Sequence, residues 1–593
     1  MRFFALFISL IPLVFLTGCS NVFSNKDAQK NALMPEQLAR EIENGKTMLV
    51  GDYSVVGNLS PMPVRGFGLV VGLSGTGGDD ANSLPYKEVY DGMNRRGIQG
   101  IRDILASPTT AVVEILGYIR PGCRSDDRFD VQVMLPPETT AKSLRGGKLL
   151  TTKLREMSVI GGQLRESKTF AFAEGPIIVD DPLASEASNP TGLKKGMILN
   201  GGTAKEPRTL SLVMKAGNES AFITDRIAKE INHRFFISGS HRKGIANAVS
   251  DSVIILDIHP DYADDISRYI RIVQSIACYE NPAKQQERLE KLKAELLNPE
   301  TSQKAAFQLE AVGKSGIEAL KPGLSSSDGE VRFHSATSLA HLGDGTSAKI
   351  LTEIAKNEPA FRVYALTALG VMRNDIEAEM SLRDLLHVPS AETRYGAFRT
   401  LKTRNPFDPA IRGEILGEQY PFSYHGITTN VQPMVHISLH RLPEIVLFGT
   451  DITLRQPFGL DAGPVIFING QTPGIVTVNR FAVTGVDEKR TVPNRLDAVI
   501  RAVVDLGGTY PDVVQLLRQG DAAKVLSCRL EIDCLPMPNR EYRRNNNSPE
   551  EQTAAEEPKK NIWQRLNPAN LFAPNPGGKS SDFEGTTNVY GRE

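Results

Sequence analysis

Cysteine and tryptophan are scarce in this sequence, which has five cysteines and one tryptophan among 593 residues. No two cysteines have the C-x-x-C spacing of a zinc ribbon or a thioredoxin-like redox site, so neither kind of site is expected. Four cysteines lie beyond the first twenty residues and could form disulfides in an oxidising compartment, but their spacing does not decide a pairing. They are Cys123, Cys278, Cys528 and Cys534.

Signatures of catalysis are also missing. The sequence contains no H-E-x-x-H, no G-x-S-x-G and no phosphate-loop pattern. His436 and His440 share one face of a strand-like run, but that spacing puts them about 13 Å apart, too far for one zinc ion. The formal net charge of −1 argues against a protein that binds nucleic acid by neutralising phosphates. We therefore expect no enzymatic activity, no metal, no cofactor and no nucleic-acid partner.

The one long apolar run lies at the N-terminus, from Phe3 to Leu16, after a basic Arg2. Its length and flanks are typical of a secretory signal, and Cys19 after small residues resembles the lipid-attachment cysteine of bacterial lipoproteins. The alternative is an ordinary signal peptide with a chance cysteine. Ser20 after Cys19 resembles lipoproteins of the outer membrane, so we expect residues 1–18 to be a signal, Cys19 to carry lipid and residues 19–46 to be a spacer. No later segment is expected to cross a membrane.

A glycine-rich stretch, VRGFGLVVGLSGTGGDD from Val64 to Asp80, follows the spacer. Its apolar centre predicts a buried strand that enters a tight turn. Gly66 and Gly68 predict a close backbone approach or a bulge, whereas Gly75, Gly77 and Gly78 predict positive φ angles. The spacing is not that of a phosphate cradle, so nucleotide binding is not expected.

Further strands and one helix are predicted before residue 180. Thr110–Ile119 is rich in β-branched residues and predicts a strand, and Tyr86–Leu105 is expected to be helical. A second distinctive stretch, KSLRGGKLLTTKL, begins at Lys142, and its Gly146-Gly147 pair predicts a turn. Arg145 and Lys148 beside the turn could bind an anion; the alternative is a solvated turn tip.

These two stretches resemble the signatures of the flagellar P-ring protein family, with Asp130-Val131-Gln132-Val133 and Ala173-Glu174-Gly175 in the same order. Asp79-Asp80-Ala81-Asn82 departs from the family pattern. A third resemblance lies at Leu506–Ile532, after the amphipathic helix predicted at Asn494–Leu506. The residues that we expect to matter for assembly, by this resemblance, are Gly66, Gly68, Gly72, Gly75, Gly77, Lys142, Ser143, Leu144, Arg145, Gly146 and Gly147.

The resemblance implies a periplasmic subunit of the flagellar basal body. Such a subunit would assemble with copies of itself into a ring around the rod, with the rod and L-ring proteins and peptidoglycan as partners. The alternative is an outer-membrane lipoprotein scaffold that keeps the P-ring fold and binds a protein partner.

Residues 279–406 contain an internal repeat that the family typically lacks. Helical stretches recur at offsets of 30, 30 and 32 residues, with equivalent apolar positions at Leu309, Leu339, Leu369 and Leu401. This pattern resembles HEAT-like repeats, in which pairs of helices stack as a solenoid. The solenoid would be a partner-docking arm or, alternatively, a rigid spacer.

We therefore expect an α+β protein: a β-rich P-ring-type body in two segments, at 47–278 and 407–535, interrupted by an all-α HEAT-like solenoid. The two segments are expected to close into one body. Glu444–Phe448 predicts one of the strands of the second segment. The polar residues 536–593 predict a disordered C-terminal tail, in which Trp563 could dock on a partner.

Overall fold

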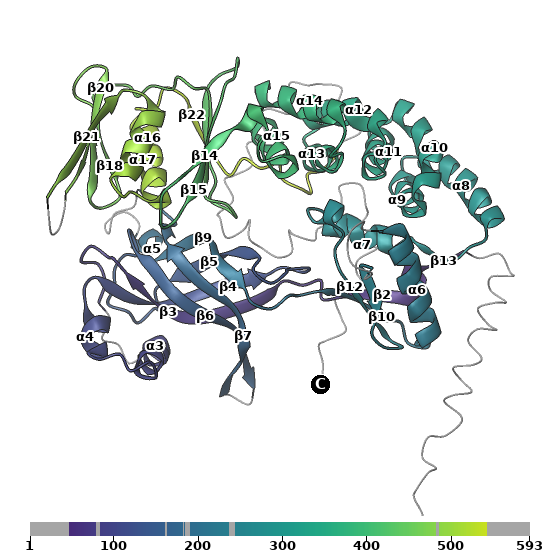
Figure 1. Ribbon diagram of the computed structural model, residues 1–593, viewed down its shortest axis with the longest axis horizontal. Coiled ribbons are helices and arrows are strands. Elements are labelled where there is room, and N and C mark those ends of the chain that lie inside the picture. The colour runs from purple at the N-terminus through teal and green to yellow at the C-terminus, as the bar shows by residue number, and fades with distance from the viewer. Residues whose placement is uncertain are drawn as a thin grey trace, which may run out of the picture.

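The computed structural model describes residues 47–78, 83–160, 163–181, 183, 190–236, 244–481 and 486–542. The predicted signal, Cys19, the spacer and Trp563 lie outside these residues. The described chain forms four bodies that follow one another around a closed loop (Figure 1). We call them the closed sheet, the α/β unit, the helical region and the C-terminal β unit. Within the described ranges, no helix has both the length and the apolar character needed to cross a membrane.

The closed sheet holds the first predicted motifs. Its strands are β3 (Met62–Val71), β4 (Thr110–Ile119), β5 (Arg128–Met134), β6 (Lys148–Ile160), β7 (Gln163–Pro176), β8 (Ile178–Val179) and β9 (Lys195–Ala204). They run in the order β5-β4-β3-β6-β7-β9-β8, and an additional pairing between β5 and β9 closes the sheet on itself. Apolar side chains such as Val64, Val113 and Val131 fill the inside.

Three short helices accompany the closed sheet: α3 (Leu84–Asn94), α4 (Ile101–Ala106) and α5 (Pro190–Leu193). The helix predicted over Tyr86–Leu105 is therefore two helices. Gly97 and Gly100 lie between them with φ angles of +73° and +65°, which end the first helix and redirect the chain.

The α/β unit is built from pieces on both sides of the closed sheet. Its elements are β1 (Met48–Leu49), α2 (Val50–Tyr53), β2 (Ser54–Gly57), β10 (Leu210–Met214), α6 (Ala221–Arg234), β11 (Ala246–Ala248), β12 (Val253–Leu256), η1 (Pro260–Tyr262), α7 (Ile266–Gln274) and β13 (Ala277–Tyr279). Its sheet has the order β11-β12-β10-β2. Ile223, Ile227 and Ile231 lie on one face of α6 and join the core of this unit. Residues 47–278 are thus two bodies rather than one.

The helical region occupies the upper right of Figure 1. Its helices are α8 (Pro282–Leu296), α9 (Ser302–Val312), α10 (Ile317–Leu320), α11 (Gly329–His341), α12 (Ala348–Asn357), α13 (Arg362–Val371), α14 (Ile376–Asp384) and α15 (Ala391–Arg404), with short 3₁₀ turns η2 (Lys314–Gly316), η3 (Lys321–Ser325), η4 (Gly345–Ser347) and η5 (Leu385–His387). The four repeated stretches of the sequence are α9, α11, α13 and α15, and their equivalent leucines are buried.

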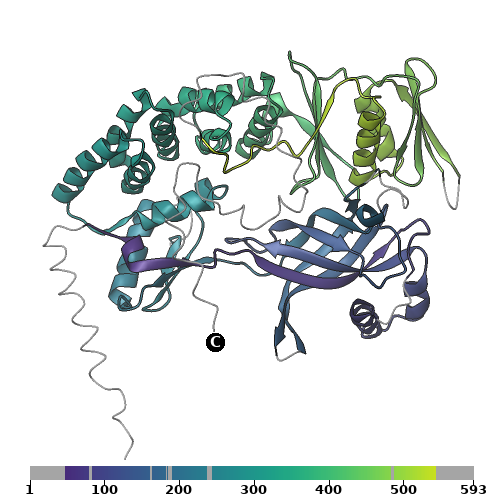
Figure 2. The ribbon, with the colours of Figure 1, turned by 180° about the vertical axis from the view of Figure 1, so that it is seen from behind.

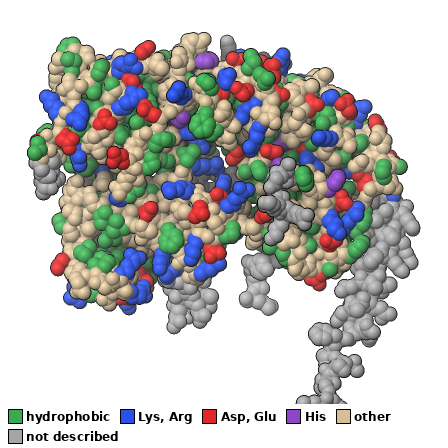
Figure 3. Space-filling model, in the orientation of Figure 1, with side chains coloured by type: hydrophobic (Ala, Val, Ile, Leu, Met, Phe, Trp, Pro, Cys, Tyr) green, Lys and Arg blue, Asp and Glu red, His purple; other side chains and the backbone are tan. Residues whose placement is uncertain are grey.

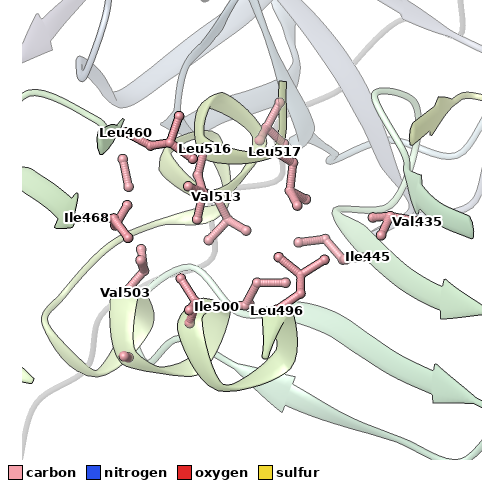
Figure 4. Close-up of a cluster of buried hydrophobic side chains, with 14 of the residues drawn as sticks. Val435, Ile445, Leu460, Ile468, Leu496, Ile500, Val503, Val513, Leu516 and Leu517 are labelled. Carbon is pink, nitrogen blue, oxygen red and sulfur yellow. The ribbon is translucent and has the colours of Figure 1, made fainter. Parts of the chain in front are cut away.

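The C-terminal β unit has two sheets with two helices between them. One sheet joins β14 (Gly413–Leu416), β15 (Phe422–Ile427), β17 (Glu444–Phe448), β16 (Met434–Ile437) and β22 (Arg529–Ile532), after η6 (Pro409–Ile411). The other joins β18 (Gly459–Ala462), β19 (Ile466–Asn469), β20 (Ile475–Arg480) and β21 (Glu488–Pro493). Figure 4 shows side chains of α16 (Leu496–Asp505) and α17 (Tyr510–Ala522) pointing into the shared core, with Val435 and Ile445 from one sheet and Leu460 and Ile468 from the other.

The two β-rich segments form separate sheets that pack against each other, and the expectation that they close into one ring-forming body stays a prediction. Among the described strands, no pairing joins residues before the helical region to residues after it. Each segment has a core of its own, but Ile178 of the first segment belongs to the core of the C-terminal β unit. The core of the helical region also extends into the C-terminal β unit, where Phe398 of α15 joins Met434 and Phe448. The two segments still touch, at the contact described below.

The tail prediction also needs a correction. Residues 536–542 are described, and they pack against the helical region; Pro536 is buried.

On the face shown in Figure 3, acidic and basic side chains are interspersed, in keeping with the net charge of −1.

Candidate functional site: the junction of the two motifs

The two distinctive stretches of the sequence lie side by side. Strand β3 pairs with β6, with Val70 opposite Leu149 and Val71 opposite Lys148. Beyond the strands, the Lys142 N–H donates to the Thr76 carbonyl at 2.8 Å, and the Thr76 hydroxyl donates to the Ser143 carbonyl at 2.9 Å. We call residues 66–78 and 142–148 together the motif junction.

Three glycines of the junction make room for neighbouring chain. A Cβ atom added at Gly66 would overlap the Lys153 carbonyl oxygen, and one at Gly68 would overlap the Thr152 hydroxyl. The pairing of β3 with β6 shifts register between Arg65 and Val70, so the predicted close approach and bulge are present here. A Cβ atom at Gly77 would overlap the Thr110 carbonyl oxygen.

Other glycines of the junction are needed for their backbone angles. Gly72, Gly75 and Gly146 have φ angles of +82°, +80° and +73°, in the region that glycine adopts without strain. Gly78 has the predicted positive φ as well, at +100°. The prediction of positive φ is wrong for Gly77, whose requirement is space beside β4.

The second motif forms a tightly bonded turn. Ser143 and Leu144 are buried, and the Leu144 N–H donates to the Leu193 carbonyl at 2.9 Å. The Gly147 N–H donates to the Leu144 carbonyl at 3.0 Å, and the Arg145 N–H donates to the Ser143 hydroxyl at 3.1 Å. The Lys142 residue is exposed. The turn is therefore held by its backbone and presents a fixed surface.

That surface faces the C-terminal β unit. A Cβ atom at Gly146 would lie 3.2 Å from Cγ of Pro464, and the Lys148 ammonium lies 4.7 Å from the centre of the Tyr420 ring. Burial lowers the pKa of Arg145, although Asp181 and Asp461 oppose this shift. The turn thus touches another part of the chain while Gly146 stays exposed, and anion binding by Arg145 and Lys148 stays a prediction.

A second contact between the two segments uses Asp130 of β5. Its carboxylate accepts the Asn200 N–H at 2.9 Å and the Arg441 N–H of the C-terminal β unit at 2.6 Å. Burial raises the pKa of Asp130, and the two N–H donors partly offset that rise. Ile178 of β8 joins the apolar core of the C-terminal β unit. Asp130 lay within a family signature, but nothing in the sequence pointed to Arg441 as its partner.

A depression of about 340 Å³ lies on the C-terminal β unit and is lined by Arg412, Glu414, Tyr424, Arg495, Asp497 and Arg501. Arg501 pairs with Glu414 at 2.8 Å and with Asp497 at 2.9 Å. Arg495 pairs with Asp497 at 3.0 Å. The two carboxylates thus hold two of the three arginines, and the depression is lined by an ion network.

His436 and His440, the pair considered for zinc, have different partners. His436 Nε2 accepts the Cys534 N–H at 3.1 Å, whereas His440 Nδ1 lies 2.8 Å from the Asp533 carboxylate. The four described cysteines are free thiols, and burial raises the pKa of Cys123 to about 11. Within the described residues, no group of three or more His, Cys, Asp or Glu side chains could hold a metal ion.

Comparison with known proteins gives one family. Residues 50–286 match the model of the flagellar P-ring protein family, a range that contains both halves of the motif junction and Asp130. The family resemblance read from the two motifs is therefore confirmed over this range. The matched range ends before most of the helical region, so the resemblance at Leu506–Ile532 stays a prediction.

Similar proteins carry the same description. The chain is 29% identical over 224 residues to a flagellar P-ring protein of Thermotoga maritima, covering 36% of this chain and 61% of that protein. It is 25% identical over 217 residues to one of Geobacter metallireducens (35% and 54%) and 30% identical over 208 residues to one of Aquifex aeolicus (33% and 53%). The chain thus spans between half and two thirds of the length of these relatives.

Proposed function

We propose that this chain is a structural subunit of a flagellar basal-body P ring, a periplasmic bushing around the rod that supports motility. The observation that carries the proposal is the match over residues 50–286 to a family and to relatives described as flagellar P-ring proteins. Both motifs on which the resemblance was based lie inside that range, and the glycines in them have a structural need to be glycine. A ring subunit needs self-association and no turnover chemistry.

The proposed assembly is a closed ring of identical copies with head-to-tail contacts. The proposed partners are the rod and L-ring proteins and peptidoglycan. We further propose that lipid at Cys19 tethers the subunit to the outer membrane. The glycines and turn residues of the motif junction would act in assembly indirectly, by holding the closed sheet against the C-terminal β unit.

The helical region supports a second candidate function. We propose that it is a HEAT-like solenoid, and that the chain could serve as an envelope scaffold that binds a protein through it. The observation in favour is that residues 536–542 already lie on this region, with Arg540 paired to Glu392 and Tyr542 against Phe361.

Deletion of the gene tests the first function. We expect loss of swimming and of the ring in basal bodies imaged by cryo-tomography, with both restored by a plasmid copy. A tagged copy should add density at the ring. Deletion mutants that swim and have normal basal bodies would favour the scaffold. For the lipid anchor, a Cys19→Ser copy should leave the outer-membrane fraction, whereas unchanged fractionation would contradict it.

A further inference from the structure

The depression on the C-terminal β unit has features that its ion network does not explain. In Figure 2 this unit lies at the upper right, with its two helices between its two sheets. The depression has a volume of about 340 Å³, and residues of β14, β15 and α16 supply most of its lining. This volume is at the lower end of the range for pockets that bind small ligands.

A missing side chain helps to open the depression. Tyr424 and Gly426 are two residues apart on β15, so they lie on the same face of the strand, and Glu414 of β14 is paired with Tyr424. A Cβ atom added at Gly426 would meet nothing within 4 Å, and the φ angle of this glycine is not positive. Neither its backbone nor its neighbours require glycine at this position, so the effect of Gly426 is to leave space on this face.

The charges that line the depression do not balance. Glu414 and Asp497 both bind Arg501, and Asp497 also binds Arg495. Arg412 lines the depression as well; it is exposed, and its side chain has no hydrogen-bond or ion-pair partner within the described residues. Three guanidinium groups thus face two carboxylates, which leaves the positive charge of Arg412 available to a ligand.

A tyrosine hydroxyl in the lining is also without a partner. Tyr424 is 4% exposed, and the guanidinium carbon of Arg501 lies 5.1 Å from the centre of its ring. In the part of the chain that the structure describes, the Tyr424 hydroxyl makes no hydrogen bond. Burial raises the pKa of Tyr424 to about 12, although Arg501 opposes this rise, so the hydroxyl keeps its proton and can donate it to a hydrogen bond. Buried hydroxyls normally have a partner, and a group that enters the depression would supply one.

We propose that this depression is a binding site for a single carboxylate group, which accepts two parallel N–H bonds from Arg412 and a third hydrogen bond from the Tyr424 hydroxyl. One carboxylate brings one negative charge, which matches the one guanidinium that lacks a counter-charge. A phosphate with up to two charges would be repelled more strongly by Glu414 and Asp497. The carboxylate could belong to a small free acid or to an acidic side chain of another protein. This inference goes beyond the proposed ring function and does not depend on it.

The proposal is tested on the full chain by saturation-transfer NMR, which detects weak ligands of large proteins. The probes are butyrate and the blocked peptide acetyl-Gly-Glu-Gly-amide, each of which carries one carboxylate. The neutral control is the same peptide with glutamine in place of glutamate. We expect a carboxylate probe to bind and the glutamine peptide not to bind. A glutamate peptide that binds at least as tightly as butyrate assigns the site to an acidic side chain, whereas one that binds about tenfold more weakly assigns it to a small free acid.

Three variants locate the binding. Arg412→Gln should weaken the affinity at least about tenfold, because it removes two charge-assisted hydrogen bonds, and Tyr424→Phe should weaken it about threefold or more. Gly426→Val should abolish binding by filling the open space. The matched control is Arg102→Gln on α4, which changes an exposed arginine outside the depression and should leave the affinity unchanged.

Equal affinity of the wild-type chain and Arg412→Gln for the carboxylate probes would overturn the site. Because Arg412 is exposed and holds no partner, this variant is expected to keep the wild-type unfolding midpoint, which a thermal melt checks. Equal binding of the glutamate and glutamine peptides, or tighter binding of inorganic phosphate than of butyrate, would overturn the assignment to a carboxylate. None of these readouts involves flagella, so they succeed or fail separately from the ring function.

Discussion

The joint between the α/β unit and the helical region depends on one buried ion pair. Glu310 of α9 is fully buried, and Arg268 of α7 is 5% exposed. The Glu310 carboxylate accepts the Tyr262 hydroxyl at 2.7 Å and two Arg268 donors, and Arg268 also donates to the Ser338 hydroxyl at 3.0 Å. Burial alone would raise the pKa of Glu310, but Arg268 holds that pKa below its usual value. The pair is therefore ionised.

Replacing Glu310 with Gln should destabilise this joint strongly. Glutamine has nearly the same shape and can still accept the Tyr262 hydroxyl, but it leaves the Arg268 charge buried without a counter-charge. Breaking one side of a buried pair costs about 3–5 kcal/mol. For a cooperative unit of this size, that corresponds to a fall of about 10 °C in the unfolding midpoint. Phe307 and Ala311 of α9 lie in the core of the α/β unit, so the loss should spread into it.

Two variants make the test specific. Asp225→Asn breaks an exposed pair with Lys229 on α6, and exposed helix pairs contribute only about 0.5 kcal/mol. Arg268→Met combined with Glu310→Leu removes both charges and should recover most of the lost stability. Differential scanning calorimetry and hydrogen exchange in α9 measure the effect. If Glu310→Gln lowers the midpoint no more than Asp225→Asn does, the buried charge does not hold the joint.

Two further outcomes follow from the structure. Gly77→Ala should cost about 2 kcal/mol of unfolding free energy, because the new Cβ overlaps the Thr110 carbonyl. The control is Gly92→Ala in α3, where space is open, and it should be neutral or slightly stabilising. Equal unfolding midpoints of the two variants in thermal melts would contradict this expectation. Acidification should destabilise the fold as the pH falls below 6.5, because three buried histidines take up protons in the unfolded chain while burial lowers their folded pKa values to about 3 or 4. Each should remove about 2 kcal/mol of unfolding free energy between pH 7 and pH 5, and stability in urea that does not change over that interval would refute the reasoning. They are His334, His341 and His436.

Local sequence signals predicted many elements well. The β-branched runs Thr110–Ile119 and Glu444–Phe448 form β4 and β17 with the same bounds. The repeats at offsets near 30 residues correspond to α9, α11, α13 and α15 because a buried stripe of leucines is a strictly local pattern. Glycine content also predicted the bulge in β3, since a close backbone approach leaves no room for a side chain.

The contacts between distant parts of the chain could not be read in the same way. The Asp130–Arg441 bond joins residues 311 positions apart, and it is made by a backbone N–H, which any residue other than proline could supply. Residues 536–542 were predicted to be disordered as part of the polar tail, yet Arg540 is held by an ion pair and Tyr542 by an aromatic contact. Composition describes a segment by itself, whereas these contacts depend on what another segment presents.

The two ends of the helical region bear on whether it is a mobile arm or a rigid bridge. At its start, Glu310 is held by Arg268 and Tyr262 of the α/β unit. At its end, Glu444 of β17 is buried and is bound by Tyr395, Arg399 and Lys402 of α15, the first at 3.0 Å.

Each joint therefore buries a glutamate whose hydrogen-bond and ion-pair partners come from the other body, and separating the bodies would break those bonds. The apolar core is also continuous across both joints. A bridge fixed at both ends holds the α/β unit and the C-terminal β unit at a set distance around the loop of Figure 1. The bridge then also fixes the separation across which the closed sheet and the C-terminal β unit make their own contact, at Asp130 and Arg441.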